Sequence, residues 1–197
     1  MGDGTFLFRE FLRCPLQVGA VLPSSPSLAT VAARTVPEHG DPVVVELGPG
    51  TGPITRAVQE RLGERGRHVA VEVNPRLAEL LERRWPQVTV VRGNAVRLPD
   101  ILFRRGLTAD AVISSLPWAS FGGELQDRLL AATLNAMRDD GVFSAFAYVH
   151  ARLLPSAVRF RRRLDAAFGE VEVSPVVWRN APPAVVYFCR DPRQGGR

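Results

Sequence analysis

Val43-Val44-Val45-Glu46-Leu47-Gly48-Pro49-Gly50-Thr51-Gly52 is the stretch of sequence on which the fold of this chain depends. A β-branched run enters an acidic residue and then a loop with Gly at every second position, and a helix-compatible segment follows from Pro53. Each Gly removes a Cβ atom and permits positive φ, so the backbone of such a loop can lie very close to a ligand. The spacing differs from the G-x-G-x-x-G of dinucleotide-binding folds, and no Lys-Ser or Lys-Thr pair follows as in a triphosphate-binding loop. The stretch predicts a strand, a ligand-binding loop and a helix; an ordinary Gly-rich turn is the alternative.

The composition indicates a globular protein. With 46% hydrophobic and 23% charged residues, the chain is expected to form a single domain over residues 1–197. No segment is apolar enough to span a membrane, and the first residues lack the basic start of a secretory signal. Cys14 and Cys189 stand alone without metal-ligand spacing, so we expect a reducing, cytoplasmic location and no metal. All 25 basic residues are Arg and the net charge is +5, which permits an anionic partner such as phospholipid or RNA.

From residue 43 onward, β-type runs alternate with helical patterns, which predicts a parallel sheet wrapped by helices. The expected strands cover residues 43–47, 68–73, 88–92, 111–115, 142–148, 171–178 and 184–190. The expected helices cover residues 53–62, 75–85, 124–138 and 155–168. A short link joins the last two strands, so they should pair antiparallel. We therefore expect an α/β core over residues 41–190, preceded by a helical cap over residues 1–40.

Two short helical patterns precede the first strand, at residues 5–13 and 27–35. The first places Phe6, Phe8, Phe11 and Leu12 among Arg9, Glu10 and Arg13. Such a helix could lie on a membrane surface with its aromatic side chains inward and its Arg side chains outward. It could equally pack as a cap over a ligand site, and the two interpretations are compatible.

The E-L-G-P-G-T-G string at residues 46–52 resembles motif I of the class I S-adenosylmethionine (SAM) methyltransferases. The resemblance implies SAM as cofactor and a Rossmann-like sheet, mostly parallel with an antiparallel C-terminal hairpin strand and helices on both faces. The cofactor residues that it implies are Glu46, Gly48, Gly50, Thr51, Gly52, Glu72, Val73, Asn94, Ala95 and Ser114. Among them, Glu72 would accept the ribose hydroxyls. Asn94 stands where many family members have Asp, and its carbonyl oxygen can still accept a hydrogen bond from the adenine amine.

The segment S-S-L-P-W at residues 114–118 resembles the Asn-Leu-Pro-Tyr segment of amine methyltransferases, with Ser in place of Asn. The catalytic residues implied are Ser115, Leu116, Pro117, Trp118 and, at the end of the fifth strand, Tyr148. Trp118 would hold an alkylammonium group or the SAM sulfonium by cation–π attraction; a packed core aromatic is the alternative. His150 could act as a base, although transfer to a neutral amine needs only positioning and desolvation.

Two terminal motifs, residues 11–25 and 177–184, resemble those of bacterial phospholipid N-methyltransferases, as does F-A-Y at residues 146–148. Members of that family transfer methyl groups from SAM to phosphatidylethanolamine, some of them through to phosphatidylcholine. The resemblance implies that a phospholipid substrate is bound by Ser24, Ser25, Tyr148, Arg179 and Asn180. A rigid turn is the alternative for Arg179 and Asn180. We expect a monomer that docks peripherally, through its N-terminal helix, on anionic lipid at the inner face of the membrane, and we expect no nucleic-acid partner.

Three other functions remain open from the sequence. Ribosomal RNA adenine N6-dimethyltransferases share the E-L-G-P-G-T-G loop, but they usually carry Asn-Leu-Pro-Tyr and an additional C-terminal helical domain. A small-molecule N- or O-methyltransferase could use the same scaffold. A non-catalytic, SAM-binding membrane adaptor is suggested by Asn94 and by the lack of an evident general base.

Overall fold

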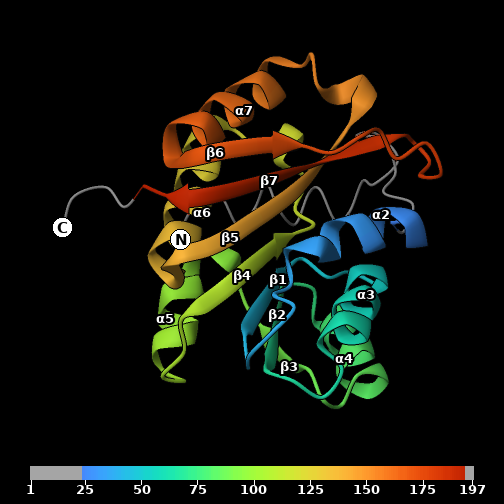
Figure 1. Ribbon diagram of the computed structural model, residues 1–197, viewed down its shortest axis with the longest axis vertical. Coiled ribbons are helices and arrows are strands. Elements are labelled where there is room, and N and C mark those ends of the chain that lie inside the picture. The colour runs from blue at the N-terminus through green and yellow to red at the C-terminus, as the bar shows by residue number, and fades with distance from the viewer. Residues whose placement is uncertain (1–23, 194–197) are drawn as a thin grey trace.

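The computed structural model describes residues 24–193, which form a seven-stranded sheet with helices on both faces (Figure 1). The strand order is β3-β2-β1-β4-β5-β7-β6. The strands are β1 (Val43–Leu47), β2 (Arg67–Glu72), β3 (Thr89–Arg92), β4 (Ala109–Ser114), β5 (Met137–Tyr148), β6 (Phe168–Val173) and β7 (Ala184–Pro192). The helices are α2 (Pro26–Ala32), α3 (Pro53–Leu62), α4 (Pro75–Arg84), α5 (Leu98–Phe103), α6 (Gly123–Ala136) and α7 (Pro155–Ala167). Short 3-10 turns are η1 (Ala33–Thr35), η2 (Ala95–Arg97), η3 (Trp118–Ser120) and η4 (Val149–Ala151).

The first five strands run parallel, and β7 inserts antiparallel between β5 and β6. The mostly parallel fold with an antiparallel C-terminal strand is thereby confirmed. Parallel strands need helical crossovers, and the alternation of strands and helices from Val43 onward supplies them. Because all crossovers leave from one end, the carboxyl ends of β1 to β4 meet at the same edge of the sheet.

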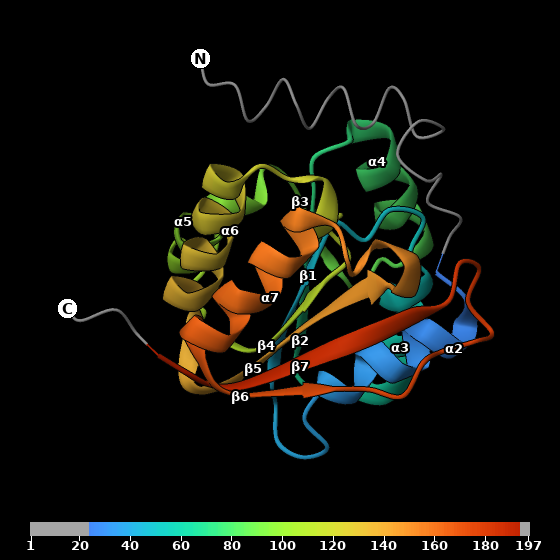
Figure 2. The same cartoon turned by 90° about the horizontal axis from the view of Figure 1, so that it is seen from above.

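The core has two layers, one on each face of the sheet. Figure 2 shows α5, α6 and α7 on one side and α2 and α3 on the other. Side chains of a strand point alternately to the two faces of the sheet, so neighbouring residues of β1 belong to different layers. Val45 and Leu47 pack in the layer of α5, α6 and α7, and Val44 packs in the layer of α2 and α3.

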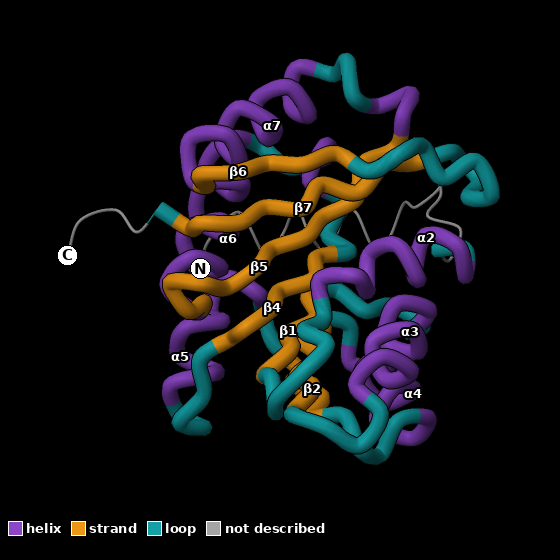
Figure 3. The backbone as a smooth tube through the Cα atoms, viewed as in Figure 1, coloured by secondary structure: helices purple, strands orange, loops and turns teal. Residues whose placement is uncertain are grey.

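The C-terminal strands differ from the sequence prediction in extent. β6 begins directly after α7 and ends at Val173, so the connection to β7 covers residues 174–183 and forms the long loop at the right of Figure 3. Only Val177 of that connection forms a bridge, to Ala184, and the Ser174 hydroxyl accepts the amide of Val186. The apolar run at residues 175–178 was predicted to be part of a strand, but most of it lies outside the hydrogen-bonded pairing of β6 with β7.

Other boundaries shift less. β5 begins at Met137, immediately after α6, and is longer than residues 142–148. The short α5 was not predicted, because six residues are too few to show a helical period. The expected helix at residues 27–35 becomes α2 followed by η1. The expected helix at residues 5–13, and Cys14, lie outside the described residues. None of the helices within residues 24–193 is long and apolar enough to cross a membrane.

Candidate active site

The loop after β1 takes the shape that its glycines permit. Gly48, Gly50 and Gly52 have φ values of 67°, 60° and 86°, a region that other residues rarely adopt. A Cβ atom on Gly48 would lie 2.8 Å from Cδ2 of Leu116, so this glycine also lets the loops after β1 and β4 pack together. Apart from its chain neighbours, no atom of residues 24–193 lies within 4 Å of the corresponding position on Gly50. The loop therefore leaves open space where a ligand could approach the backbone.

A pocket lies beside this loop at the carboxyl ends of four neighbouring strands. It is lined by Gly48, Val71, Val73, Gly93, Asn94, Ala95, Leu116, Leu125 and Leu129. Gly48 follows β1, Val73 follows β2, Asn94 follows β3 and Leu116 follows β4, while the two other leucines come from α6. The structure thus brings together four of the expected cofactor residues and one of the expected catalytic residues. Gly93, next to Asn94 after β3, and the two leucines of α6 were not predicted; the leucines line the pocket because α6 packs over the strand ends.

Glu72 joins the loop after β1 to the end of β2. Its Oε2 accepts the amide of Gly50 at 3.0 Å, and its Oε1 accepts the amide of Asn74 at 2.9 Å. Burial raises the pKa of the Glu72 carboxyl, and backbone hydrogen bonds from Asn74, Gly50 and Val73 oppose this rise. Each carboxylate oxygen has a second lone pair, so the group can still accept bonds from a ligand. Its contact with ribose stays a prediction.

Asn94 lines the pocket and caps the turn η2. Its Oδ1 accepts the amide of Val96 at 3.0 Å, which leaves one acceptor site on the carbonyl oxygen. An Asp in this position would keep the cap and add a second acceptor oxygen.

We predict that Asn94→Asp keeps or improves SAM affinity, whereas Asn94→Leu weakens it by about 0.5–1.5 kcal/mol, the range for one hydrogen bond. Asn74→Leu is the matched control, because Asn74 caps α4 in the same way but does not line the pocket. Calorimetric titration with SAM checks this. Equal affinities for wild type, Asn94→Asp and Asn94→Leu would mean that residue 94 does not contact adenine.

The loop after β4 differs from the prediction in two side chains. The Trp118 ring is 3% exposed and stacks on Phe160 with centroids 4.3 Å apart, so it is a packed core aromatic and not an open cation–π surface. The Ser114 hydroxyl is buried and accepts the Trp118 indole N–H at 3.0 Å, so it is directed at this loop and is not among the pocket's lining groups. Both corrections have one cause: η3 turns the ring inward, onto α7, immediately after Pro117. Ser115 and Pro117 are half-buried beside the pocket-lining Leu116.

Two polar side chains that the sequence did not single out fix this loop. Gln126, fully buried on α6, donates to the carbonyl oxygens of Trp118 at 2.7 Å and Ser156 at 3.1 Å. The Ser156 hydroxyl donates to the carbonyl of Ala119 at 2.5 Å. A Gln on the same helix face as Leu129 and Leu130 was the signal in the sequence, and its partners lie 8 and 30 residues away.

Glu46 was expected to bind the cofactor, but its carboxylate lies on the other face of the sheet. It is fully buried, accepts the Thr55 hydroxyl at 2.7 Å and lies 3.3 Å from Nε2 of His68. His68 in turn contacts Gln59 through Nδ1 at 2.9 Å. Because Glu46 alternates with Val45 and Leu47 along β1, its side chain must point toward α3 and away from the pocket. Thr51 and Gly52 likewise line a separate hollow between α2 and α3.

The expected substrate residues are partly brought together. Oδ1 of Asn180 accepts the amide of Ser25 at 2.9 Å, and Nδ2 of Asn180 donates to the carbonyl of Pro182. These bonds favour the rigid-turn interpretation for Asn180, while Arg179 beside it is exposed. The Ser25 hydroxyl caps α2, and Ser24 is half-buried before it. Tyr148 packs against Phe146 on the α2 face of the sheet and stacks with the exposed His150 at 5.8 Å.

Comparison with known proteins decides the family of this site. Residues 44–141 match a family described as a methyltransferase domain. Ornithine lipid N-methyltransferase of Singulisphaera acidiphila is 34% identical over 96% of this chain and 97% of its own length. The chain belongs to the class I SAM-dependent methyltransferases. Within them, the near full-length match confirms the resemblance to bacterial lipid N-methyltransferases. A small subunit ribosomal RNA methyltransferase A from Synechococcus is 42% identical, but over 34% of this chain and 25% of that protein.

Solved methyltransferase structures share the fold. A SAM-dependent O-methyltransferase from Thermotoga maritima has a TM-score of 0.66 at 15% identity, covering 96% of this chain and 73% of that one. Human methyltransferase-like protein 13, solved with SAH, has a TM-score of 0.61 at 16% identity, covering 87% and 82%.

The cofactor of this methyltransferase is SAM, and the residues present fit it. The apolar side chains around Asn94 suit the purine ring of SAM. Glu72, at the end of β2, offers two acceptor oxygens. The loop after β1 leaves space for a ligand beside Gly50.

Proposed function

We propose that this methyltransferase transfers methyl groups from SAM to the primary amine of a membrane lipid, phosphatidylethanolamine or a close relative, in the direction of phosphatidylcholine. The observation that carries the proposal is the likeness, over nearly the whole chain, to an enzyme named for N-methylation of ornithine lipid. The name of that relative also specifies a lipid substrate and N-methylation. The motifs at residues 11–25 and 177–184 point the same way.

For methyl transfer to an amine, the protein mainly has to bind the two reactants and position them. SAM supplies an activated methyl group, and the acceptor must present a neutral nitrogen in line with it. The apolar side chains of Leu116, Leu125 and Leu129 line the cofactor pocket and exclude water, which disfavours a charged ammonium nearby. Burial raises the pKa of Tyr148, so its hydroxyl stays protonated at neutral pH and serves as a hydrogen-bond donor rather than a base. Tyr148 and Arg179 are our proposed contacts to the lipid headgroup.

The proposal includes peripheral docking on anionic lipid through residues 1–13. Their aromatic and Arg side chains suit a helix that lies in the interface. We propose further that the protein acts as a monomer at the inner face of the membrane.

Acceptor choice is tested by incubating the enzyme with labelled SAM and four acceptors: phosphatidylethanolamine vesicles, ornithine lipid vesicles, small subunit ribosomal RNA and ethanolamine. We expect methylated lipid, identified by mass spectrometry, from phosphatidylethanolamine and none from RNA or ethanolamine. The ribosomal RNA arm is included because of the partial match to that enzyme class. Product from ornithine lipid alone would move the assignment to that lipid, and turnover only on ethanolamine would refute the lipid proposal.

Removal of residues 1–13 is expected to reduce vesicle binding more than SAM binding. Wild-type docking should weaken with added salt, because screening shortens the reach of surface charge. Vesicle co-sedimentation and calorimetry measure the two affinities. Equal loss of both would indicate instead that the segment covers the cofactor site.

A further inference from the structure

Large apolar side chains stand in solvent on two loops of the described chain. Leu153 is 89% exposed and Leu154 is 48% exposed, both in the connection between η4 and α7. Trp178 is 75% exposed in the connection between β6 and β7. Single exposed apolar residues are common, but clustered ones on neighbouring loops indicate an interaction site.

The two loops are neighbours in space. The amide of Val149, at the start of η4, donates to the carbonyl of Pro183, at the end of the β6–β7 connection, at 2.9 Å. The first connection follows the end of β5 at Tyr148, and the second ends at Ala184, which pairs with Tyr148, so both leave the sheet at the carboxyl end of β5. This is the carboxyl end of the parallel strands, where the SAM pocket also lies.

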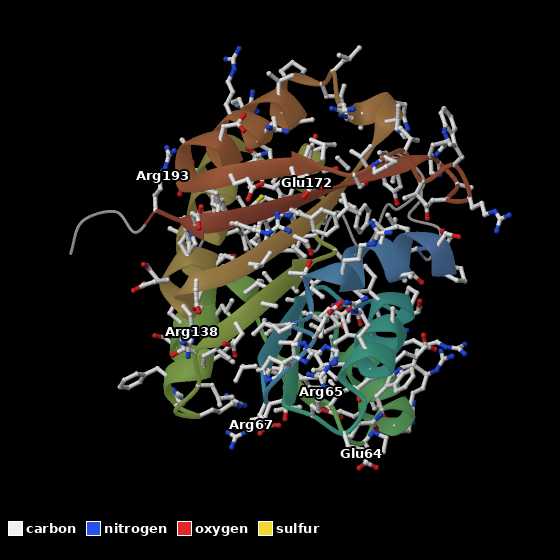
Figure 4. All side chains as sticks on the ribbon, viewed as in Figure 1. Glu64, Arg65, Arg67, Arg138, Glu172 and Arg193 are labelled. Carbon is white, nitrogen blue, oxygen red and sulfur yellow. The ribbon has the colours of Figure 1, made fainter. Side chains whose placement is uncertain are left out.

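The charge on these two loops has one sign. No acidic residue occurs between positions 141 and 164 or between positions 173 and 190. Arg152 and Arg162 line one hollow together with Leu153, and neither guanidinium has a hydrogen bond or ion pair to another described residue. The same holds for Arg179, next to Trp178. By contrast Arg138, at the amino end of β5 (Figure 4), is paired with Asp110 and Asp140.

We propose that Leu153, Leu154 and Trp178, with Arg152, Arg162 and Arg179 around them, form a second membrane-docking surface. Its partner is an anionic lipid bilayer. The leucines and the indole enter the headgroup region, where Trp is favoured because one end of its ring is polar. The guanidinium groups pair with lipid phosphates, which they match in geometry. The inference rests on the proposed lipid substrate, because this surface brings the carboxyl end of the sheet, and with it the SAM pocket, to the bilayer from which that substrate comes.

The test uses the full chain with two sets of changes. The first set consists of three variants of the docking surface. They are the double variant Leu153→Ser with Leu154→Ser, the single variant Trp178→Ser, and the double variant Arg152→Gln with Arg162→Gln. The second is a matched control at the opposite end of the sheet, Phe103→Ser with Arg104→Gln. Phe103 is 85% exposed at the end of α5, so the control removes one large exposed apolar side chain and one Arg charge.

Binding is measured without SAM on phosphatidylethanolamine vesicles with and without phosphatidylglycerol. We expect the double Leu variant to bind mixed vesicles about tenfold more weakly or worse, from the loss of apolar burial. The Arg variant should bind more weakly and show a smaller salt dependence. The control should bind as wild type, and all variants should keep wild-type SAM affinity.

Wild-type binding by all surface variants would overturn the proposal. So would a change in oligomeric state, measured by light scattering, with unchanged vesicle binding, because the surface would then join copies of this chain. Failure of the proposed function gives a different result: no methylated lipid forms in any vesicle or detergent micelle, while vesicle binding still responds to the variants.

Discussion

Replacing Glu72 by Ala is expected to weaken SAM binding by about 1.5–3 kcal/mol, the range for a hydrogen bond to a charged group. The change removes the proposed acceptor of the ribose hydroxyls. It also releases the amide of Gly50, which Glu72 holds at 3.0 Å, so the glycine loop loses its attachment to β2. Both effects act on the same ligand, and the affinity should fall by about ten- to a hundredfold.

Calorimetry with SAM measures this loss, and circular dichroism checks that the variant is folded. Glu72→Gln keeps one carbonyl acceptor without the charge and should fall between wild type and Ala. Glu79→Ala is the matched control, because Glu79 is an exposed residue of α4 that pairs with Arg83. An unchanged affinity in folded Glu72→Ala would contradict the placement of ribose at this carboxylate.

Replacing Trp118 by Ala should lower the free energy of unfolding by about 3–5 kcal/mol, as for other large-to-small changes of buried aromatics. The indole contacts Phe121, Phe143 and Phe160, and its loss would leave a cavity where α7 meets the sheet. Trp118→Phe can keep the stacking but loses the hydrogen bond to Ser114, and should cost about 0.5–1.5 kcal/mol from that bond.

Urea unfolding followed by circular dichroism gives these values. Trp178→Ala serves as control: this Trp is 75% exposed, and its loss should change the unfolding free energy by less than about 0.5 kcal/mol. If Trp118→Ala unfolded like wild type but lost turnover, the ring would be an acceptor contact, as the cation–π interpretation of the sequence has it.

The fold could be predicted from local sequence patterns because each pattern determines the conformation of a short segment of backbone. The β-branched run at Val43–Leu47 and the glycines after it specify a strand and a tight loop, whatever surrounds them. The alternation of strands and helices after Val43 predicts a parallel sheet, because parallel strands are joined by helical crossovers. The residues after β1, β2 and β3 therefore lie at one pocket, and Gly48, Val73, Asn94 and Ala95 all line it.

The failures concern side chains whose surroundings come from distant segments. Whether Trp118 opens to a ligand depends on Phe160, which lies on α7. Whether the run at residues 175–178 is a strand depends on the ladder that β7 offers, and β7 pairs with residues 168–173 instead.

The sequence by itself determined the methyltransferase core, the glycine loop and the strand ends that line the pocket, because these depend on backbone conformation and on a period of two. Only the tertiary structure decided that Glu46 faces α3, that Gln126 fixes the loop after β4, and that Leu153 and Trp178 stand on neighbouring loops. Those relations join residues far apart in the chain, and they arise when the helices pack on the sheet and select which face of each element is covered.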